Sequence, residues 1–490
     1  MLKKRWKDIV VFAAIFIFVL TCNVTYTQIE NDNIWNFHMI QKITLGYIPY
    51  KEINMIITPL FHFIGALFMK ILGTNFFTFN IYGAVILAIL GTTFYQFLKK
   101  VTTNKALRWL GMSFVIWGFS TVFLPNYNTF VVLFPLLLLF LEWKREEWIK
   151  KEQPEKIKKI DIGIGIVMAF GILTKQTIGG VFSIVYLIYL LIHDKIKLQK
   201  INWQAIGYKI LGACLIGILF LIYLLMTGSL LDFFDLCFGG ILDFAQKNRT
   251  GSFFTWETSV ILGISFFCFL YFKIKKEDTK ILLLGLFSIT SLFFIYPLIN
   301  TYHLVTSLML PSVTLIYILD LILNQIEKEA SKKIFNRVSG CIGVVIIGYI
   351  LILWCNRCYT FESIKVPEDL LQYQGLMAKE EEFEKIKKVM QYIQEKEKEG
   401  YQVYVMSADA AKYMIPLERN NNKFDLMLQG NLGYKGEERL IAEIKEIENP
   451  LFLKQEELTY QESETIDKFI KENYQIIDKI DTMIVYAKGE

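Results

Sequence analysis

The sequence predicts a polytopic α-helical membrane protein with a polar C-terminal α/β domain, and three observations support this class. Of the 490 residues, 54% are hydrophobic and 15% are aromatic, which is more than soluble domains carry. The apolar residues fall into repeated blocks of roughly 17–22 residues, the length that crosses a bilayer as a helix. Lys and Arg gather in alternate loops between these blocks, as they do in cytoplasmic loops.

The N-terminus begins with MLKKRWKD and continues with apolar residues 9–25. A charged start before an apolar core is typical of a secretion signal, but no small-residue cleavage site follows. We therefore expect an uncleaved signal-anchor with its N-terminus in the cytoplasm. The following loop, residues 26–76, is then extracytoplasmic.

The next apolar block, residues 55–72, is short and contains Pro59 and His62. The block after it, 77–98, ends in Lys99-Lys100. If residues 55–72 crossed the membrane, this basic cluster would lie outside, against the positive-inside rule. We therefore expect residues 55–72 to lie along the outer interface.

From there one topology satisfies all the loops and gives about eleven spans. Residues 161–192 are too long for one span at about 1.5 Å per residue and break at Thr174-Lys175-Gln176-Thr177. We expect a helical hairpin whose tip lies at or below the outer surface. The stretch KREEWIKKEQPEKIKK, residues 144–159, is predicted to be a basic cytoplasmic loop. The other spans are expected at 107–124, 130–143, 205–227, 258–272, 281–298, 304–323 and 339–355.

The predicted domains are residues 1–365, which form the membrane part, and residues 366–490, a polar extracytoplasmic tail. The tail begins with an amphipathic helix ended by Gly400 and continues with strand and helix patterns typical of a small α/β domain. Its Gly-rich GNLGYKG, residues 430–436, precedes a helix. It lacks Walker A or dinucleotide spacing, so a turn is favoured and anion binding is the alternative.

Seven Cys are present, and they show no metal-ligand spacing with His. Cys355 and Cys358 form a C-x-x-C at the end of a span. Two interpretations stay open for this pair: incidental thiols near a membrane edge, or a disulfide in an oxidising compartment.

Polar residues from separate parts of the chain are predicted to share the outer membrane face. A carboxylate at a water–lipid boundary can take a proton from an acceptor hydroxyl, and cations beside it can hold a phosphate. The combination suits transfer from a lipid phosphate. The candidates are Glu30 and Asp32; Asn126, Tyr127 and Asn128; Lys175 and Gln176; Lys247 and Arg249; and Tyr302 and His303.

Each candidate also has a structural interpretation. Asp32 precedes an amphipathic stretch and would serve as a helix N-cap, a role compatible with catalysis. Lys175 costs about 2.5–3.5 kcal/mol if it is stranded at mid-membrane, and a polar cavity offsets that cost. The remaining alternatives are a solvated Glu30, an ordinary loop cation at Arg249, an interfacial His303, and interface anchors at Trp35 and Tyr50.

The first outer loop resembles that of the GT-C glycosyltransferases, in the group of protein O-mannosyltransferases, aminoarabinose transferases and RgtA/B/C/D-like enzymes. That group carries an Asp about fourteen residues before Gly-x-x-Pro-Tyr, followed by an apolar interfacial segment. Asp32, the run Gly46-Tyr47-Ile48-Pro49-Tyr50 and the segment 59–73 match this pattern. Weaker matches are Leu173-Thr174-Lys175, and Tyr296-Pro297 with His303. The resemblance covers roughly residues 1–325.

The resemblance implies a polyprenyl-phosphate-linked sugar donor and inversion at the anomeric carbon. It implies Asp32, with Glu30 beside it, as the catalytic carboxylate, and Lys175, Arg249 and His303 at the donor phosphate. Asn126, Tyr127, Asn128, Gln176 and Tyr302 would bind substrate. The acceptor would be an extracytoplasmic glycan, lipid or protein, and the C-terminal domain would lie over the site.

The sequence departs from the family pattern at three points: Asn33 follows Asp32 in place of Glu, Asn126-Tyr127-Asn128 stands where many relatives carry an acidic residue, and Thr58 precedes a single Pro59. No cofactor is certain, and a divalent metal stays open. The expected partners are the donor, the acceptor and the bilayer of the plasma membrane, with no nucleic acid. The competing functions are a transporter or flippase of lipid-linked sugars, and a scaffold that presents the tail.

Overall fold

The computed structural model describes most of the chain. The side chains of residues 2–5 and 31 are outside this description. The described residues are 2–25, 31–248, 250–276, 278–359, 366–376, 378–421, 430–434, 436–457 and 462–489.

The chain folds into two compact units, each made of three segments. The first unit comprises Met1–Asn23, Gly83–Phe220 and Thr250–Phe361. The second comprises Val24–Tyr82, Leu221–Arg249 and Glu362–Glu490. The first outer loop therefore groups with the C-terminal segment, although Tyr82 and Glu362, where the two segments end and begin, are 280 positions apart in the chain.

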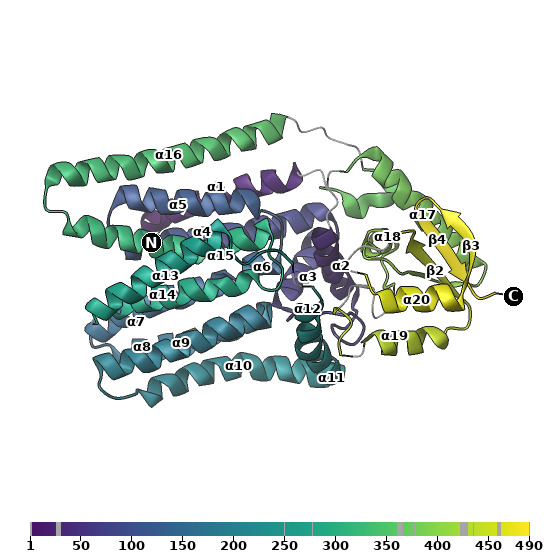
Figure 1. Ribbon diagram of the computed structural model, residues 1–490, viewed down its shortest axis with the longest axis horizontal. Coiled ribbons are helices and arrows are strands. Elements are labelled where there is room, and N and C mark those ends of the chain that lie inside the picture. The colour runs from purple at the N-terminus through teal and green to yellow at the C-terminus, as the bar shows by residue number, and fades with distance from the viewer. Residues whose placement is uncertain are drawn as a thin grey trace. The chain divides into compact units, whose positions relative to one another are not determined.

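The first unit is a bundle of long helices that run side by side (Figure 1). Its elements are α1 (Leu2–Val24), α4 (Phe76–Val101), α5 (Lys105–Thr121), α6 (Tyr127–Phe130), α7 (Leu133–Lys150), α8 (Pro154–Thr174), α9 (Gln176–Lys197), α10 (Trp203–Thr227), α13 (Trp256–Ile274), α14 (Thr279–Thr290), the 3₁₀ turn η2 (Ser291–Ile295), α15 (Thr301–Gln325) and α16 (Glu329–Tyr359).

A helix lies at each predicted span. Within the described residues, 8 helical segments are long and apolar enough to cross a membrane: α1, α4, α6–α7, α9, α10, α13, α15 and α16. The three other predicted spans correspond to α5, α8 and α14 with η2. The predicted fold class, a polytopic helical membrane protein, is confirmed.

The predicted hairpin is present, and its break falls where the sequence placed it. Helix α8 ends at Thr174, α9 begins at Gln176, and Lys175 between them is extended, with φ −154° and ψ 104°. The two arms touch backbone to backbone, because a Cβ added at Gly179 would lie 2.1 Å from the carbonyl carbon of Gly171. This close packing fixes Lys175 at the tip.

The segment predicted as a basic cytoplasmic loop, residues 144–159, is mostly helical. Helix α7 continues to Lys150 and α8 begins at Pro154, so only three residues connect them. The reason is that Arg145 turns inward to ion-pair with Glu142 and Asp161. These charges hold the two helices together where the sequence pattern indicated solvent.

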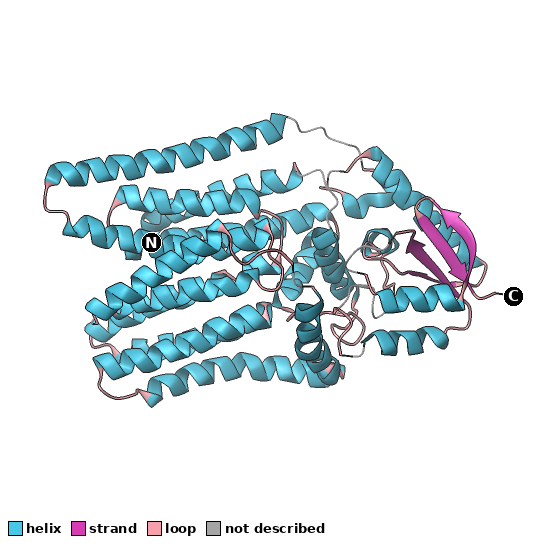
Figure 2. Ribbon diagram, viewed as in Figure 1, coloured by secondary structure: helices cyan, strands magenta, loops and turns pink. Residues whose placement is uncertain are grey.

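The second unit contains a small α/β core and several short helices, and Figure 2 shows the strands confined to its C-terminal segment. The helices are α2 (Asn31–Leu45), α3 (Leu60–Leu72), α11 (Leu230–Phe234), the π-helix η1 (Asp235–Gly240), α12 (Ile241–Lys247), the 3₁₀ turn η3 (Glu368–Tyr373), α17 (Glu380–Lys398), α18 (Ala411–Leu417), α19 (Gly436–Lys445) and α20 (Glu464–Asn473). The strands are β1 (Gln402–Val405), β2 (Pro450–Gln455), β3 (Gln475–Ile480) and β4 (Met483–Ala487).

The sheet has the order β1-β2-β4-β3. Strands β1 and β2 are parallel, and the other two pairs are antiparallel. Phe452 of β2 and Tyr486 of β4 pack against Ile466 and Ile470 of α20 in a buried apolar cluster. This confirms the α/β tail that the sequence predicted.

The first outer loop packs against the C-terminal segment inside the second unit. The Trp35 indole donates to the carbonyl oxygen of Ala408 at 2.9 Å, and the Gln41 amide donates to that of Ile415 at 2.9 Å. Tyr50 is fully buried, with its hydroxyl donating to Ile57 O at 3.1 Å. Trp35 and Tyr50 are therefore held by protein contacts, which corrects their interpretation as interface anchors.

Helix α3 has 13 residues and spans about 20 Å, which is shorter than the roughly 30 Å hydrocarbon core of a bilayer. This length fits the expectation that residues 55–72 lie along an interface. The interfacial placement itself stays a prediction.

Residues 430–434 of the Gly-rich segment form a turn whose backbone already binds a carboxylate, that of Asp235. Gly430 and Gly433 have φ values of +83° and +82°. The N–H of Tyr434 donates to Asp235 Oδ1 at 3.0 Å, and Arg439 donates to Asp235 Oδ2 at 3.1 Å. The carboxylate of Asp235 thus takes a donor that an external anion would need, which favours the turn.

Candidate functional site

Three of the predicted outer loops meet at one end of the first unit. At the hairpin tip, Lys175 Nζ donates to Asn128 Oδ1 at 2.5 Å. The same ammonium lies 5.7 Å from the centre of the Tyr127 ring, within the range of a cation–π contact. Lys175 is half-buried, and Gln176, the first residue of α9, is buried. The predicted convergence of Lys175 with Tyr127 and Asn128 is thus present.

Asn126 acts through local structure. It is the N-cap of α6, and its side-chain oxygen accepts from the backbone N–H of Asn128 at 2.8 Å. This bond fixes the turn that carries Tyr127 and Asn128. Asn126 therefore positions the residues that contact Lys175.

The third loop contributes two residues at the start of α15, Tyr302 and His303. The Tyr302 hydroxyl is hydrogen-bonded to Thr129, one residue after Asn128. Asn300 caps α15 by accepting from the backbone N–H of His303 at 3.0 Å, and it also contacts the His303 ring at 2.8 Å. The His303 ring lies edge-on to the Tyr302 ring, with 5.7 Å between the ring centres. The two candidates from this loop therefore belong to the same polar cluster.

The polar cluster is centred on one cation, the Lys175 ammonium. Among the described residues of the first unit, Lys175 forms no ion pair with a carboxylate. Its partners are a neutral amide and an aromatic ring. A half-buried ammonium in this setting favours a ligand that brings negative charge, and phosphate oxygens match it in charge and hydrogen bonding.

Asp32 lies in the second unit, in the first turn of α2, and its side chain is exposed. It is the second residue of the helix, so it lies just inside the N-terminus and not at the cap position. Its backbone oxygen accepts from Asn36 Nδ2 at 2.7 Å. Glu30 and Arg249 lie outside the described residues. Lys247, at the end of α12, pairs with Asp243 at 3.2 Å and Glu437 at 3.9 Å, so it serves as a structural contact.

A buried histidine lies beside the helix that carries Asp32. His62 is fully buried, and its Nε2 is 3.2 Å from Asn36 Oδ1. Burial lowers the pKa of His62 to about 3, so the ring is neutral at physiological pH. Sequence reasoning noted His62 only as a polar interruption of an apolar block.

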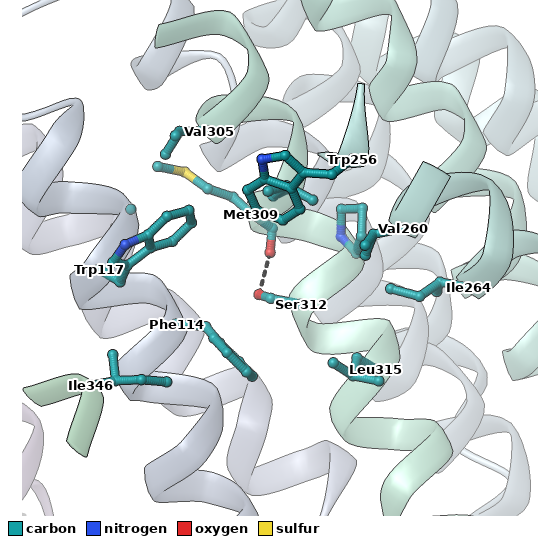
Figure 3. A pocket seen from close by; sticks show the side chains of 13 residues that line it. Phe114, Trp117, Trp256, Val260, Ile264, Val305, Met309, Ser312, Leu315 and Ile346 are labelled. Carbon is teal, nitrogen blue, oxygen red and sulfur yellow. Dashed lines mark hydrogen bonds between the residues drawn. The ribbon is translucent and has the colours of Figure 1, made fainter. Parts of the chain in front are cut away.

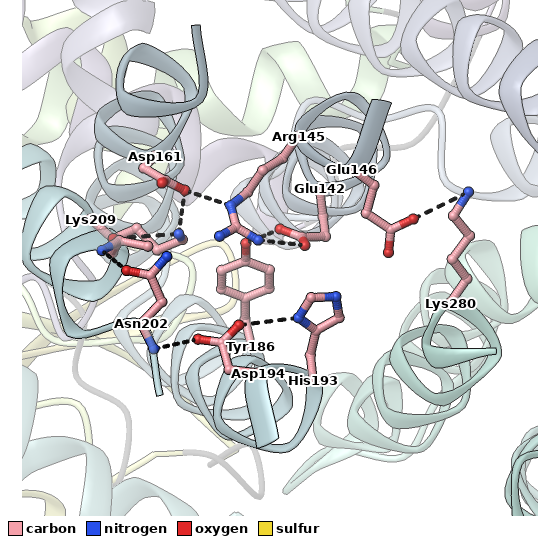
Figure 4. Close-up of polar contacts among 11 residues, drawn as sticks. Glu142, Arg145, Glu146, Asp161, Tyr186, His193, Asp194, Asn202, Lys209 and Lys280 are labelled. Atoms are coloured by element: carbon pink, nitrogen blue, oxygen red, sulfur yellow. Dashed lines mark hydrogen bonds and ion pairs between the residues drawn. The ribbon is translucent and has the colours of Figure 1, made fainter. Parts of the chain in front are cut away.

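The opposite end of the first unit contains a buried ion network that sequence reasoning missed (Figure 4). Arg145 is 1% exposed and donates to Asp161 Oδ1 at 2.8 Å and to Glu142 Oε1 at 3.2 Å. Tyr186 donates to Glu142 Oε2 at 2.5 Å, and Lys209 pairs with Asp161. These contacts tie α7, α8, α9 and α10 together.

Part of this network has the composition of a cation site. Ligand atoms of Glu142, Glu146 and His193 lie within 4.8 Å of one another, and no metal-ligand spacing in the sequence marked them. Lys280 already pairs with Glu146 at 3.4 Å, and Asp194 contacts the His193 ring at 3.2 Å. Arg145, Lys209 and Lys280 pair with Glu142, Asp161 and Glu146, so these three carboxylates already have cationic partners.

An apolar cavity of about 260 Å³ lies between α5, α13, α15 and α16 (Figure 3). Val305 and Met309 of α15 line it. They follow Tyr302 by three and seven residues, which places all three on one face of the helix. The cavity therefore begins about one turn along α15 from the polar cluster. Other lining side chains are Phe114, Trp117, Trp256 and Ile346.

No protein-family model matches this chain, and no curated protein matches it. Its structure is similar to that of ArnT from Cupriavidus metallidurans in the apo state, with a TM-score of 0.60 and 10% sequence identity over 99% of this chain and 98% of that chain. A second match is the same protein bound to undecaprenyl phosphate, with a TM-score of 0.48 and 11% identity over 98% and 97% of the two chains. The full-length match to the apo structure confirms the predicted fold.

Proposed function

We propose that this chain, which has the GT-C glycosyltransferase fold, transfers a sugar from a polyprenyl-phosphate carrier to an extracytoplasmic glycan, lipid or protein. In this proposal the reaction inverts the anomeric carbon. The enzyme is a hexosyl or pentosyl transferase of the plasma membrane, with its N-terminus in the cytoplasm and its C-terminal segment outside.

The observation that carries the proposal is the cation at the hairpin tip. Lys175 is held by Asn128 and Tyr127 and has no carboxylate partner among the described residues of its unit. A phosphate would offset this charge, and the leaving group of a polyprenyl-phosphate donor is a phosphate.

The surroundings of the cluster favour a lipid-linked donor over a water-soluble one. The apolar cavity along α15 begins about one helical turn from Tyr302, at Val305, and its lining is almost entirely apolar. A chain of isoprene units would lie against Val305 and Met309 while its phosphate stays near Lys175. The solved protein of the same fold has also been crystallised with undecaprenyl phosphate.

The chemistry requires a base and a stabilised leaving group. Asp32 would take the proton from the acceptor hydroxyl as its oxygen forms the bond to the anomeric carbon. The bond from that carbon to the phosphate oxygen breaks, and Lys175 with His303 and Arg249 would stabilise the negative charge that develops there. The exposed side chain of Asp32 is accessible to an acceptor.

The direct test is an Asp32→Asn variant measured beside the wild-type chain. We expect it to retain the co-purifying polyprenyl phosphate, detected by mass spectrometry, while sugar transfer falls roughly 10²–10⁴-fold. Near-normal transfer would remove Asp32 from the mechanism. Absence of any polyprenyl phosphate from the wild-type protein, together with no binding of added carrier, would remove the donor class.

A topology test is independent of the chemistry. A reporter fused after Glu490 should read extracytoplasmic, because an odd number of predicted spans separates it from a cytoplasmic N-terminus. A cytoplasmic signal would contradict the orientation and place Lys175 on the wrong face.

A further inference from the structure

A second groove lies on the first unit, between α1 and α5, with Tyr95 of α4 at its edge. Its volume is about 510 Å³, larger than the apolar cavity along α15. Nothing in the proposed transfer reaction uses it. The groove is amphipathic: its rim carries charges and indoles, and its floor is apolar. The rim residues are Trp6, Lys7, Lys105, Arg108 and Trp109.

The rim carries three cations: Lys7, Lys105 and Arg108. Lys7, Lys105 and Arg108 form no ion pair among the described residues, whereas neighbouring lysines do. Lys99 pairs with Asp8 at 2.7 Å, and Lys100 pairs with Glu147 at 2.7 Å. Asp8, which follows Lys7 in the chain, is therefore already paired, and no carboxylate of the described residues offsets the three rim cations.

The groove is apolar beyond this rim. Ile15 and Met112 are 5% exposed and lie deeper along the two helices, with Val10 nearer the rim. The indoles of Trp6 and Trp109 are 56% and 69% exposed. Tryptophan prefers the level of lipid headgroups, so the rim lies where a headgroup would lie and the floor where acyl chains would lie.

The groove is separate from the polar cluster at the hairpin tip. Helix α5 begins at Lys105 and ends at Thr121, shortly before Asn126 and Asn128. Its 17 residues span about 25 Å, so the cationic rim and the cluster lie at opposite ends of the bundle. The rim is at the end that the sequence assigns to the cytoplasmic face.

We propose that this groove binds an anionic glycerophospholipid of the inner leaflet. The headgroup phosphate and its negative charge lie between Lys105, Arg108 and Lys7, and the acyl chains follow the floor formed by α1 and α5. A zwitterionic lipid carries no net charge to offset the three cations. Basic pockets on the cytoplasmic side of membrane proteins bind anionic lipid headgroups, and the lipids of that leaflet carry negative charge.

The test is native mass spectrometry of the purified full-length chain, titrated with dioleoyl phosphatidylglycerol or dioleoyl phosphatidylcholine. We expect phosphatidylglycerol to bind selectively. A Lys105→Gln/Arg108→Gln variant should bind it roughly 10–30-fold more weakly, because each basic residue near an anionic headgroup contributes comparable affinity. Both side chains reach solvent, so the variant should keep the wild-type melting temperature.

A matched control removes the same charge from the same face. Lys195 and Lys197 at the end of α9 are exposed and lie outside the groove. A Lys195→Gln/Lys197→Gln variant should bind phosphatidylglycerol within about twofold of wild type. Equal loss in both variants would overturn the proposal, because only a general attraction would remain. So would equal binding of the two lipids, or displacement of phosphatidylglycerol by undecaprenyl phosphate at equal concentration.

Discussion

The two ends of the helical bundle hold buried or half-buried cations in opposite ways. At one end Arg145 is 1% exposed and contacts two carboxylates, Glu142 and Asp161. At the other end Lys175 is half-buried, and its partners among the described residues of its unit are the amide of Asn128 and the ring of Tyr127. Their charge does not distinguish the two residues, because each is a single cation among apolar helices.

The partners separate them. A buried cation paired with carboxylates stabilises the arrangement that pairs it, and removing it leaves uncompensated charge. A cation held by neutral groups keeps its attraction for an anion from outside. The Arg145 end is therefore a complete structural network, which we call the closed end. The Lys175 end is a site that a ligand completes, and we call it the open end.

The largest expected effect is on stability at the closed end. Arg145→Met should lower the free energy of unfolding by about 3–5 kcal/mol, because Glu142 and Asp161 lose a shared partner in a buried setting. The measurement is thermal denaturation of the purified protein in one detergent. The matched control is Lys175→Met, which leaves no carboxylate behind and should cost less than about 1 kcal/mol. Equal destabilisation by both variants would erase the distinction between the two ends.

The next effect is on binding at the open end. Lys175→Met should weaken binding of a polyprenyl phosphate roughly 10–100-fold, because a charge-assisted hydrogen bond to phosphate is lost. Lys175→Arg keeps the charge and should recover most of the affinity. Affinity is measured by titration of the purified chain with the phosphate lipid. Unchanged binding in Lys175→Met would mean that Lys175 has a structural role and does not bind the phosphate.

Hydropathy and the distribution of basic loops predicted much of the open end. The apolar run at 161–192 with polar residues at its centre placed Lys175 at a hairpin tip, and the alternation of loops placed Asn128 and Tyr302 on the same side. Each inference needed only span length and loop side, which are local properties of the sequence. The three loops do meet in the structure.

The closed end could not be predicted in this way, because its charges are favourable only in combination. Arg145, Asp161 and Lys209 come from three helices, and the sequence pattern placed Arg145 in a basic loop and the other two in separate spans, with no partner for any of them. Pairing becomes visible only when the helices are assembled. The same holds for Trp35 and Ala408, which are hydrogen-bonded across 373 positions of the chain and join the first outer loop to the C-terminal segment.

A buried histidine in the second unit adds a third case to the comparison, a titratable group that stays neutral when it is buried. The pKa of His62 is about 3 when folded and near 6.5 when unfolded, so the unfolded chain binds more protons below pH 6.5. Stability should therefore fall as pH drops below 6.5, by about 1.4 kcal/mol for each pH unit. The His62→Gln variant should show a flatter profile between pH 6.5 and 4.5 in thermal denaturation. An unchanged slope would contradict the neutral, buried assignment.

The smallest effect comes from making the open end resemble the closed one. Asn128→Asp places a carboxylate 2.5 Å from the Lys175 ammonium without changing side-chain size. The new ion pair should compete with phosphate and weaken polyprenyl-phosphate binding about fivefold, while the melting temperature holds or rises. Asn126→Asp is the matched control, because Asp caps a helix as well as Asn does and the Asn126 side chain accepts from the backbone of α6. If Asn128→Asp bound the lipid as tightly as wild type, the absence of an acidic partner at Lys175 would have no bearing on the ligand.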